Sequence, residues 1–312
     1  IPIHQLEIIA KETEALAVFS KELGRLLDSD KEINYALFFL NSYELRPGGG
    51  FIGSIGKITM KQYTLTQFVI EDVYELDGQI IDHHDPHFAV RTYLNQPHEF
   101  LRDSNFSPDF KTAVRKALPY LRYLPVFDVA YDGAIGITTG AFEKLLEVTG
   151  PVYLSDYNVT ITDGNFFEKT QNKIESGFFP GSDQKRNLLQ SLGNTSINRL
   201  EELPLPRIVT FLYAMLTSKD IVLYAKDVQL ETLLTSLGWS GTQKLPVRDY
   251  IFPVSANVGV NKVNKYVRTT MELQIVHQPP RQQRIFKAVF TNSSRESSAF
   301  GGTYKNYFQL YT

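Results

Sequence analysis

The sequence contains no cysteine among its 312 residues. This absence excludes disulfide bridges, thiolate metal sites and a cysteine nucleophile. It does not decide the compartment, because both cytosolic proteins and bacterial surface proteins that avoid thiols fit such a composition.

The chain also lacks a charge excess and a long apolar run. Its net charge is −2 and its pI is near 6.4, so no global basic field favours nucleic acid, and an anion site has to be a local cluster. No apolar run approaches the roughly 18 residues that span a bilayer. A chain that begins with Ile1-Pro2 is expected to have been trimmed. An upstream membrane anchor fits that expectation.

Familiar catalytic motifs are missing as well. There is no G-x-S-x-G elbow and no G-x-G-x-x-G before a helix. His83, His84 and His87 are metal ligands by type, but they lie in a loop with Pro86 that supplies no helix to fix their spacing. We therefore expect a solvated, mobile loop without a metal. The 17 tyrosines and 21 phenylalanines are spread along the chain and are expected to serve mainly as core.

What is present is an interleaving of helix and strand patterns, which predicts a layered α/β/α domain with a mixed central sheet. An amphipathic helix comes first, over residues 4–28. The expected strands are 35–40, 52–60, 64–74 and 132–137, and the expected helices are 108–123, 139–148, 163–176, 185–192, 205–216 and 227–237. Ser107 is the expected cap of the helix that Pro108 opens.

After Leu245 the pattern changes to β-type segments at 249–255, 265–276, 284–292 and 304–311. These predict a small antiparallel β module. We divide the chain into an N-terminal helix (1–32), an α/β domain (33–245) and a β-rich module (246–312), whose final strands are expected beyond residue 312.

The segment Arg46-Pro47-Gly48-Gly49-Gly50-Phe51-Ile52-Gly53-Ser54 follows the apolar run 35–40. Ligands bind at strand ends of open α/β sheets, and glycines let backbone N–H groups approach an anion. The alternative is a tight turn between two strands with Arg46 in solvent.

A second cluster, Leu101-Arg102-Asp103-Ser104-Asn105-Phe106-Ser107-Pro108-Asp109-Phe110, surrounds a helix start. A helix N-terminus and a guanidinium suit a phosphate. Equally, Arg102 can pair with Asp103 or Asp109 while the other polar groups cap the helix.

A third cluster opens the helix at 185–192. Lys185 and Arg186 lie in its first turn, where the helix dipole disfavours cations unless an anion is near. Solvated side chains are the alternative.

Several segments together resemble a bacterial family of membrane-anchored envelope proteins that is catalogued as a domain of unknown function. The resemblance covers the chain from about residue 33. It rests on residues 41–54, 101–110 and 132–137, and on Trp239, Ala256-Asn257-Val258-Gly259, Lys262 and Tyr304-Lys305-Asn306-Tyr307.

A second resemblance is to the LytR-CpsA-Psr phosphotransferases, which move a glycopolymer from a polyprenyl pyrophosphate carrier onto the cell wall. Arg102-Asp103 is similar to that family's Arg-Asp pair, and Asp183 and Arg186 ahead of Gln190 are similar to its Asp and Arg ahead of Gln. The family's Arg-Ser-Asp, whose Asp helps hold magnesium, is replaced by Arg46-Pro47-Gly48-Gly49.

The resemblance implies a protein on the extracytoplasmic face of a bacterial membrane, with a polyprenyl-linked glycan or cell-wall polymer as partner and Mg²⁺ as cofactor. Implied catalytic residues are Arg102, Asp103 and Asp109, and implied substrate-binding residues are Arg46, Gly48, Gly49, Asp183, Lys185 and Arg186. Two functions stay open. One is phosphoryl transfer, and the other is non-catalytic binding of a glycan or lipid-linked precursor, or a surface scaffold.

Overall fold

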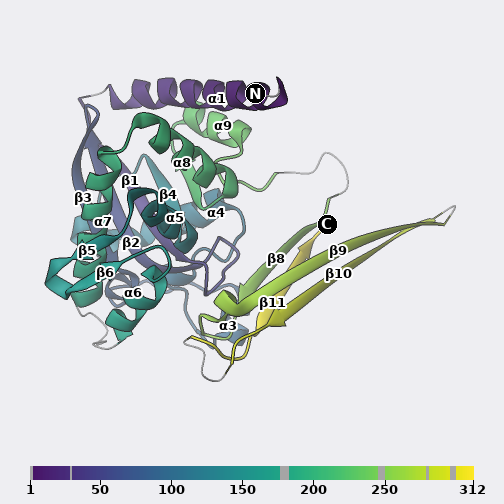
Figure 1. The fold of residues 1–312 in the computed structure, drawn as a ribbon. Coiled ribbons are helices and arrows are strands. Elements are labelled where there is room, and N and C mark those ends of the chain that lie inside the picture. The colour runs from purple at the N-terminus through teal and green to yellow at the C-terminus, as the bar shows by residue number, and fades with distance from the viewer. Residues whose placement is uncertain (1–2, 29, 176–182, 245–249, 279–280, 296–299) are drawn as a thin grey trace.

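A computed structural model shows a five-stranded mixed sheet with helices on both faces and a β-rich C-terminal part (Figure 1). It describes residues 3–28, 30–175, 183–244, 250–278, 281–295 and 300–312. The strand order is β3-β2-β1-β4-β7. Its strands are β1 (Ile33–Asn41), β2 (Phe51–Lys61), β3 (Thr64–Asp72), β4 (Gly133–Thr138) and β7 (Ile221–Ala225).

Strand β1 is the centre of the sheet because its run of apolar side chains can be buried on both faces. It pairs antiparallel with β2 and parallel with β4, in a register that places Leu40 opposite Thr138. The carboxyl ends of β1 and β4 therefore meet at one edge of the sheet, the place where open α/β sheets bind ligands.

One face of the sheet is covered by α5, α6 and α7. Helix α5 follows β4 directly and begins at a side-chain cap, because the Thr138 hydroxyl accepts a hydrogen bond from Ala141 N. Gln190 of α7 bonds the backbone of β3 at Ile70 N and Phe68 O, which covers this edge strand. The elements here are α5 (Thr139–Thr149), β5 (Val152–Leu154), β6 (Val159–Ile161), α6 (Phe166–Glu175) and α7 (Asp183–Glu201).

The other face packs the main hydrophobic core, in which Phe38 and Ile55 of the sheet meet Phe110 and Leu121. The segments are short helices joined by turns: α2 (Val73–Asp77), α3 (Phe88–Tyr93), η1 (Leu101–Asp103), α4 (Phe110–Ala117), η2 (Leu118–Tyr123) and η3 (Pro125–Phe127). Asp109 caps α4, accepting from Thr112 N, so the expected Ser107 cap is wrong by two residues. Ser107 Oγ instead accepts from Asp109 N.

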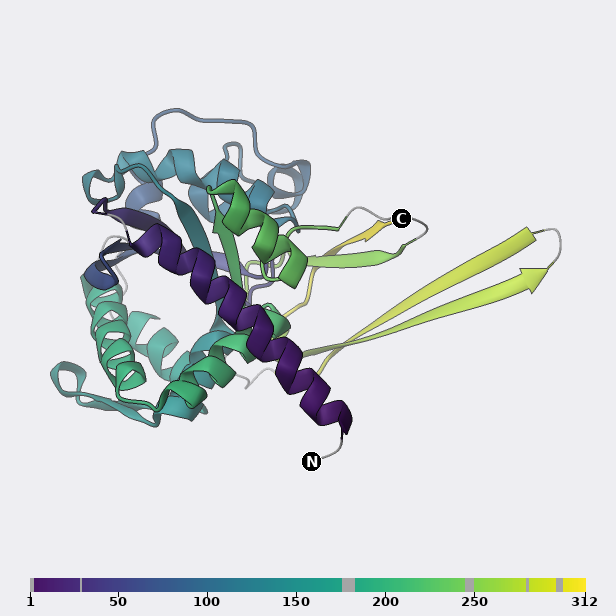
Figure 2. The ribbon, with the colours of Figure 1, turned by 90° about the horizontal axis from the view of Figure 1, so that it is seen from above.

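The edge strand β7 is flanked by α8 (Leu205–Ser218) and α9 (Val228–Leu237). The long helix α1 (Ile3–Leu27) lies across the outside of α9, as the two views show (Figures 1 and 2). Trp239 joins these parts, because its buried ring packs edge-on against Phe19 of α1 and Tyr213 of α8.

The C-terminal part consists of two antiparallel pairs. One joins β8 (Phe252–Asn257) to β11 (Asn306–Tyr311), and the other is a hairpin of β9 (Val267–Gln278) and β10 (Arg281–Asn292). Asn257 N donates to Leu45 O, and Asn264 N, in η5 (Val263–Tyr266), donates to Tyr43 O. These bonds hold the pair β8–β11 to the loop after β1, whereas the hairpin projects away from the body (Figure 2).

The predicted fold class is confirmed: a mixed sheet lies between helices, and small antiparallel sheets follow. The domain boundaries at 33 and 246 stay predictions. Strand β7 and the short pair β5–β6 were not predicted, because three- to five-residue segments carry little periodicity.

Candidate ligand-binding site

The glycine-rich loop after β1 is packed against the helical face. Gly48 N donates to Asn105 O at 3.0 Å, and Gly49 N donates to Arg46 O at 3.0 Å. A Cβ on Gly48 would stand 2.8 Å from Asn105 O, and Gly49 has φ +107. The glycines are thus needed for close approach and backbone conformation. The N–H groups of the predicted substrate-binding residues Gly48 and Gly49 are occupied within the protein.

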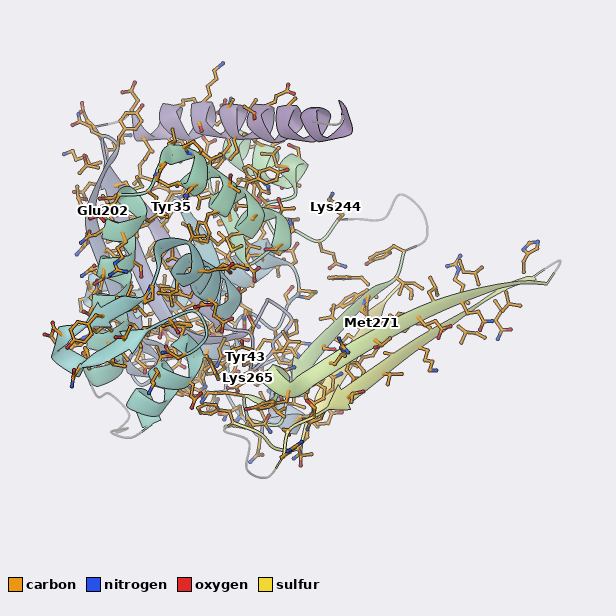
Figure 3. The ribbon with its side chains drawn as sticks, viewed as in Figure 1. Tyr35, Tyr43, Glu202, Lys244, Lys265 and Met271 are labelled. Atoms are coloured by element: carbon orange, nitrogen blue, oxygen red, sulfur yellow. The ribbon has the colours of Figure 1, made fainter. Side chains whose placement is uncertain are left out.

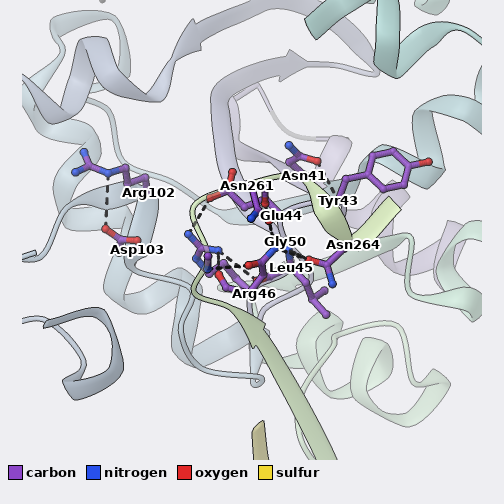
Figure 4. Close-up of polar contacts among 12 residues, drawn as sticks. Asn41, Tyr43, Glu44, Leu45, Arg46, Gly50, Arg102, Asp103, Asn261 and Asn264 are labelled. Carbon is purple, nitrogen blue, oxygen red and sulfur yellow. Dashed lines mark hydrogen bonds and ion pairs between the residues drawn. The ribbon is translucent and has the colours of Figure 1, made fainter. Parts of the chain in front are cut away.

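Arg46 is buried, with only 2% of its surface exposed, so the alternative of a solvated Arg46 is wrong. Its guanidinium donates to Asn257 O at 2.7 Å and to Glu44 Oε1 at 3.1 Å, and it lies against the Phe51 ring. The side chain therefore links the loop to the β8 strand. Figure 4 shows this network.

Arg102 pairs with Asp77 at 2.8 Å, and its Nε lies 3.7 Å from Asp103 Oδ2. Its side chain is 15% exposed, and its guanidinium lies over the Phe100 and Tyr74 rings. Burial raises the pKa of Asp77 to about 6 and also raises the pKa of Asp103, against the charges of the arginines. The pair expected from the sequence, Arg102 with Asp103, exists, but the closer partner of Arg102 is Asp77.

Asp109, the third predicted catalytic residue, has both carboxylate oxygens engaged by backbone donors. Oδ1 accepts from Thr112 N at 2.7 Å and Oδ2 from Gln243 N at 2.8 Å. This carboxylate fixes the start of α4 to the segment after α9. Its geometry is that of a structural cap.

The third cluster opens helix α7. Arg186 pairs with Glu71 of β3, at 3.5 Å between Nη1 and Oε1. Asp183 and Lys185 lie in the first turn of α7, but their side chains are outside the described residues.

The structure brings some of the predicted residues together and not others. Arg46 and Arg102 both lie near Asp103, because the positive charge of each opposes the rise in the Asp103 pKa that burial causes (Figure 4). Arg186, on α7, instead lies beside β3, where it pairs with Glu71. None of the three arginines is among the side chains that line the apolar pocket described next, although Arg46 and Arg102 each lie against a ring that does.

That pocket has a volume of about 330 Å³, within the range of about 300–1,000 Å³ that is usual for small-molecule sites. It lies between the strand ends and helices α5, α6 and α7. Its apolar walls come from Phe39, Leu40, Phe51, Ile70, Ile137, Phe142, Phe166, Phe167 and Leu189. The Phe142 and Phe166 rings stack 5.2 Å apart. Polar lining groups include Glu44, Ser54, Tyr74, Thr138, Thr139, Thr170 and Lys262.

Two lysines from the β-rich part lie beside this pocket. Lys262 lines it, with Nζ 5.5 Å from the centre of the Phe300 ring, and the Phe300 ring packs edge-on against Phe167. Lys265 Nζ lies 5.5 Å from the Phe167 ring centre and 6.0 Å from that of Tyr43 (Figure 3). Positive charge is therefore placed at the side of the pocket where the β-rich part meets α6.

The histidine loop differs from expectation at His87. Its Nδ1 accepts from Ala89 N at 3.1 Å, capping α3, and its ring stacks on Phe106. Burial lowers the pKa of His87. His87 is thus half-buried and structural, whereas His83 and His84 are exposed.

The described residues offer Mg²⁺ a poor fit. They include no group of three or more His, Asp or Glu side chains that could hold a metal. Asp103 Oδ2 is buried beside two guanidinium groups, which repel a divalent cation. We therefore derive no step through magnesium.

Comparisons with known proteins agree with the first resemblance. Residues 30–174, from β1 to α6 and just under half of the chain, match a family described as "Protein of unknown function (DUF4012)". No curated protein matches the sequence. Within the described residues, every helix is too short or too polar to cross a bilayer.

Among solved structures, the chain is similar to protein gbs0355 from Streptococcus agalactiae, at 13% identity over 68% of this chain and 75% of that one, with a TM-score of 0.44. It is also similar to TagV from Bacillus subtilis, at 11% identity over 72% of this chain and 88% of that one, with a TM-score of 0.37. The family match itself confirms the predicted resemblance to a domain of unknown function over residues 30–174.

Proposed function

We propose that this protein binds the apolar chain of a polyprenyl-pyrophosphate-linked envelope precursor in the pocket beside β1. The observation that carries the proposal is the pocket itself. Its walls are phenylalanine and aliphatic side chains, and its volume of about 330 Å³ suits one stretch of an isoprenoid chain.

The charges around the pocket suit the anionic end of such a lipid. Lys262 is part of the lining, and Arg102 lies 5.3 Å from the centre of the Tyr74 ring, which also lines it. Cations close to an apolar cavity favour a ligand that joins a hydrocarbon chain to a pyrophosphate. The sequence resemblance to the LytR-CpsA-Psr proteins points to the same class of lipid.

Binding is favoured over turnover because a predicted catalytic group, Asp109, and a predicted substrate-binding group, Arg46, both make structural contacts. Asp109 caps α4, and Arg46 donates to Glu44 and Asn257 O. Phosphoryl transfer is the second candidate. The partial exposure of the Arg102 side chain beside Tyr74 favours it, since a guanidinium can neutralise developing charge on a phosphate.

Gly53 provides a test of the binding site. It lines the pocket, and a Cβ built there meets nothing closer than Phe51 Cδ1 at 3.9 Å, so a larger side chain at this position fills the cavity without a backbone clash. Gly164 is the matched control, because its nearest neighbour is Thr162 Oγ1 at 4.0 Å and it does not line the pocket.

We expect Gly53→Leu to weaken binding of geranylgeranyl pyrophosphate by about tenfold or more, measured by calorimetry, because the leucine side chain occupies volume that the isoprenoid chain would fill. Gly164→Leu should bind like the wild type. Equal affinity in Gly53→Leu and the wild type would overturn the proposal. A separate assay of glycopolymer transfer with Arg102→Gln tests the second candidate, which predicts turnover in the wild type and its loss in the variant.

A further inference from the structure

A second pocket lies at the same strand ends, next to the glycine-rich loop. Its volume is about 430 Å³, and it shares Leu40 and Thr138 with the apolar pocket. The loop contributes Pro47, Gly48 and Gly49, and the segment after α9 contributes Gly241, Thr242, Gln243 and Lys244. Of the site residues predicted from the sequence, only Gly48 and Gly49 line this second pocket, and the proposed lipid site does not use it.

Two lysines line it. Lys219 stands at the C-terminus of α8 in a left-handed conformation, with φ 68 and ψ 19, and Lys244 follows Gln243. Figure 3 labels Lys244 between the α/β body and β8. No ion pair of either lysine is found among the described residues. Burial lowers the pKa of Lys219, and the charge of Lys244 lowers it further. Like charges held together this way create a local positive potential that favours an anion.

The nearby carboxylates are engaged by other groups. Asp220 accepts from the Thr138 and Ser218 hydroxyls, at 2.7 and 2.6 Å. Asp109 accepts from Thr112 N and Gln243 N. The Asp220 and Asp109 carboxylates therefore have donors of their own and need no lysine.

The walls are fixed before any ligand arrives. Phe110 N donates to Gly241 O at 3.2 Å, and Gln243 is held through its backbone by Asp109 and through its side chain by Tyr250. Gly241 has φ +62, and a Cβ there would meet Phe110 Cβ at 2.9 Å. A segment held at several points can present donors without losing much entropy on binding.

Thr242 supplies an independent sign of a ligand. Its Oγ1 is buried and has no hydrogen-bond partner in the described part of the chain. A buried hydroxyl without a partner is costly, and such groups usually have a water or ligand partner. Thr242 also lines this pocket, beside the two lysines.

We propose that this second pocket is an oxyanion site that binds a phosphate-type group through Lys219, Lys244 and the Thr242 hydroxyl. The site is separate from the lipid pocket and does not depend on the lipid function. Its chemistry suits a multiply charged anion such as pyrophosphate, because two ammonium groups and a hydroxyl can each contact a different oxygen.

Calorimetric titration with inorganic pyrophosphate, in the absence of lipid, tests this site. Lys219→Gln/Lys244→Gln should lower the affinity by about tenfold or more, and Thr242→Val should lower it by a smaller factor. Lys61→Gln is the matched control, because Lys61 lies at the far end of β2 and outside this pocket, and it should bind like the wild type.

Two further variants locate the anion. Gly53→Leu, which fills the apolar pocket, should leave pyrophosphate affinity unchanged, so failure of the lipid proposal and failure of this one are distinguishable. The proposal is overturned if the wild type does not bind pyrophosphate, if the lysine double variant binds like Lys61→Gln, or if Lys262→Gln alone abolishes binding. Thermal unfolding of each variant establishes that it is folded.

Discussion

Leu40 and Thr138 stand opposite each other across β1 and β4, and both residues line both pockets. The apolar pocket lies on the side of α5 and α6, and the lysine-lined pocket lies on the side of Phe110 and Gly241. The carboxyl ends of two parallel strands thus lie between the proposed lipid pocket and the proposed anion site.

Shortening Leu40 tests this partition. Leu40 is 3% exposed, so Leu40→Ala should lower the free energy of unfolding by about 2–5 kcal/mol, because it leaves a cavity in the core. It should also weaken geranylgeranyl pyrophosphate binding. Urea denaturation and calorimetry measure the two effects. Isoprenoid binding that is unchanged in a folded Leu40→Ala protein would argue against a role for Leu40 in the lipid site.

Removing Arg46 should damage stability more than a surface arginine does. Arg46→Met leaves Glu44, whose side chain is 12% exposed, without its partner, and we expect a loss of about 3 kcal/mol in urea denaturation. Adding Glu44→Gln should recover part of that loss in a double-mutant cycle. An Arg46→Met protein as stable as the wild type would show that Arg46 is not a structural clamp.

Asp109→Ala should cost about 1–2 kcal/mol of unfolding free energy, because α4 loses its N-cap. The contact with Gln243 N is lost in the same variant, which adds to the cost. Ser107→Ala serves as the control and should cost less, since its hydroxyl accepts only from Asp109 N. A larger loss of unfolding free energy in Ser107→Ala than in Asp109→Ala would show that Ser107 is the N-cap instead.

Asp77 predicts a pH dependence of stability. Burial raises its pKa to about 6 from 3.8, so the folded state binds the proton more tightly than the unfolded state does. This contribution to stability is complete below about pH 4 and is lost as the pH rises through 6. Asp77→Asn should remove that part of the slope, in addition to a constant loss from the broken pair with Arg102. Denaturant midpoints between pH 4 and 7 measure it, and an equal slope in both proteins would contradict the assignment.

The fold was largely predictable because the long elements carry strong periodicity. The run from Tyr35 to Leu40 becomes the central strand, and helix α9 ends at Leu237 as predicted. The charged residues were found as well, since Arg102 and Asp103 are neighbours in the sequence. The hydrogen-bond partners of the arginines were not predictable, because they come from other parts of the chain. Asp77 accepts from Arg102, and the backbone of Asn257 accepts from Arg46.

The residues that line the apolar pocket were not predicted, for a physical reason. Phe39, Phe142 and Phe166 occupy positions on strand and helix patterns that also suit an ordinary core, and a phenylalanine beside a cavity has the same local sequence as one in a core. Lys262 was indicated only by a family resemblance. The second pocket was missed similarly, because Lys219, Thr242 and Lys244 form no motif along the chain.

Photo-crosslinking tests the central claim, a lipid chain in the apolar pocket, most directly. A polyprenyl pyrophosphate analogue with a diazirine in its chain is irradiated with the wild-type protein, and the modified peptides are identified by mass spectrometry. The account predicts adducts on residues 137–142 and 166–170, with their loss in Gly53→Leu and their retention in Gly164→Leu. Adducts confined to other parts of the chain, such as the exposed hairpin β9–β10, or adducts unaffected by Gly53→Leu, would contradict it.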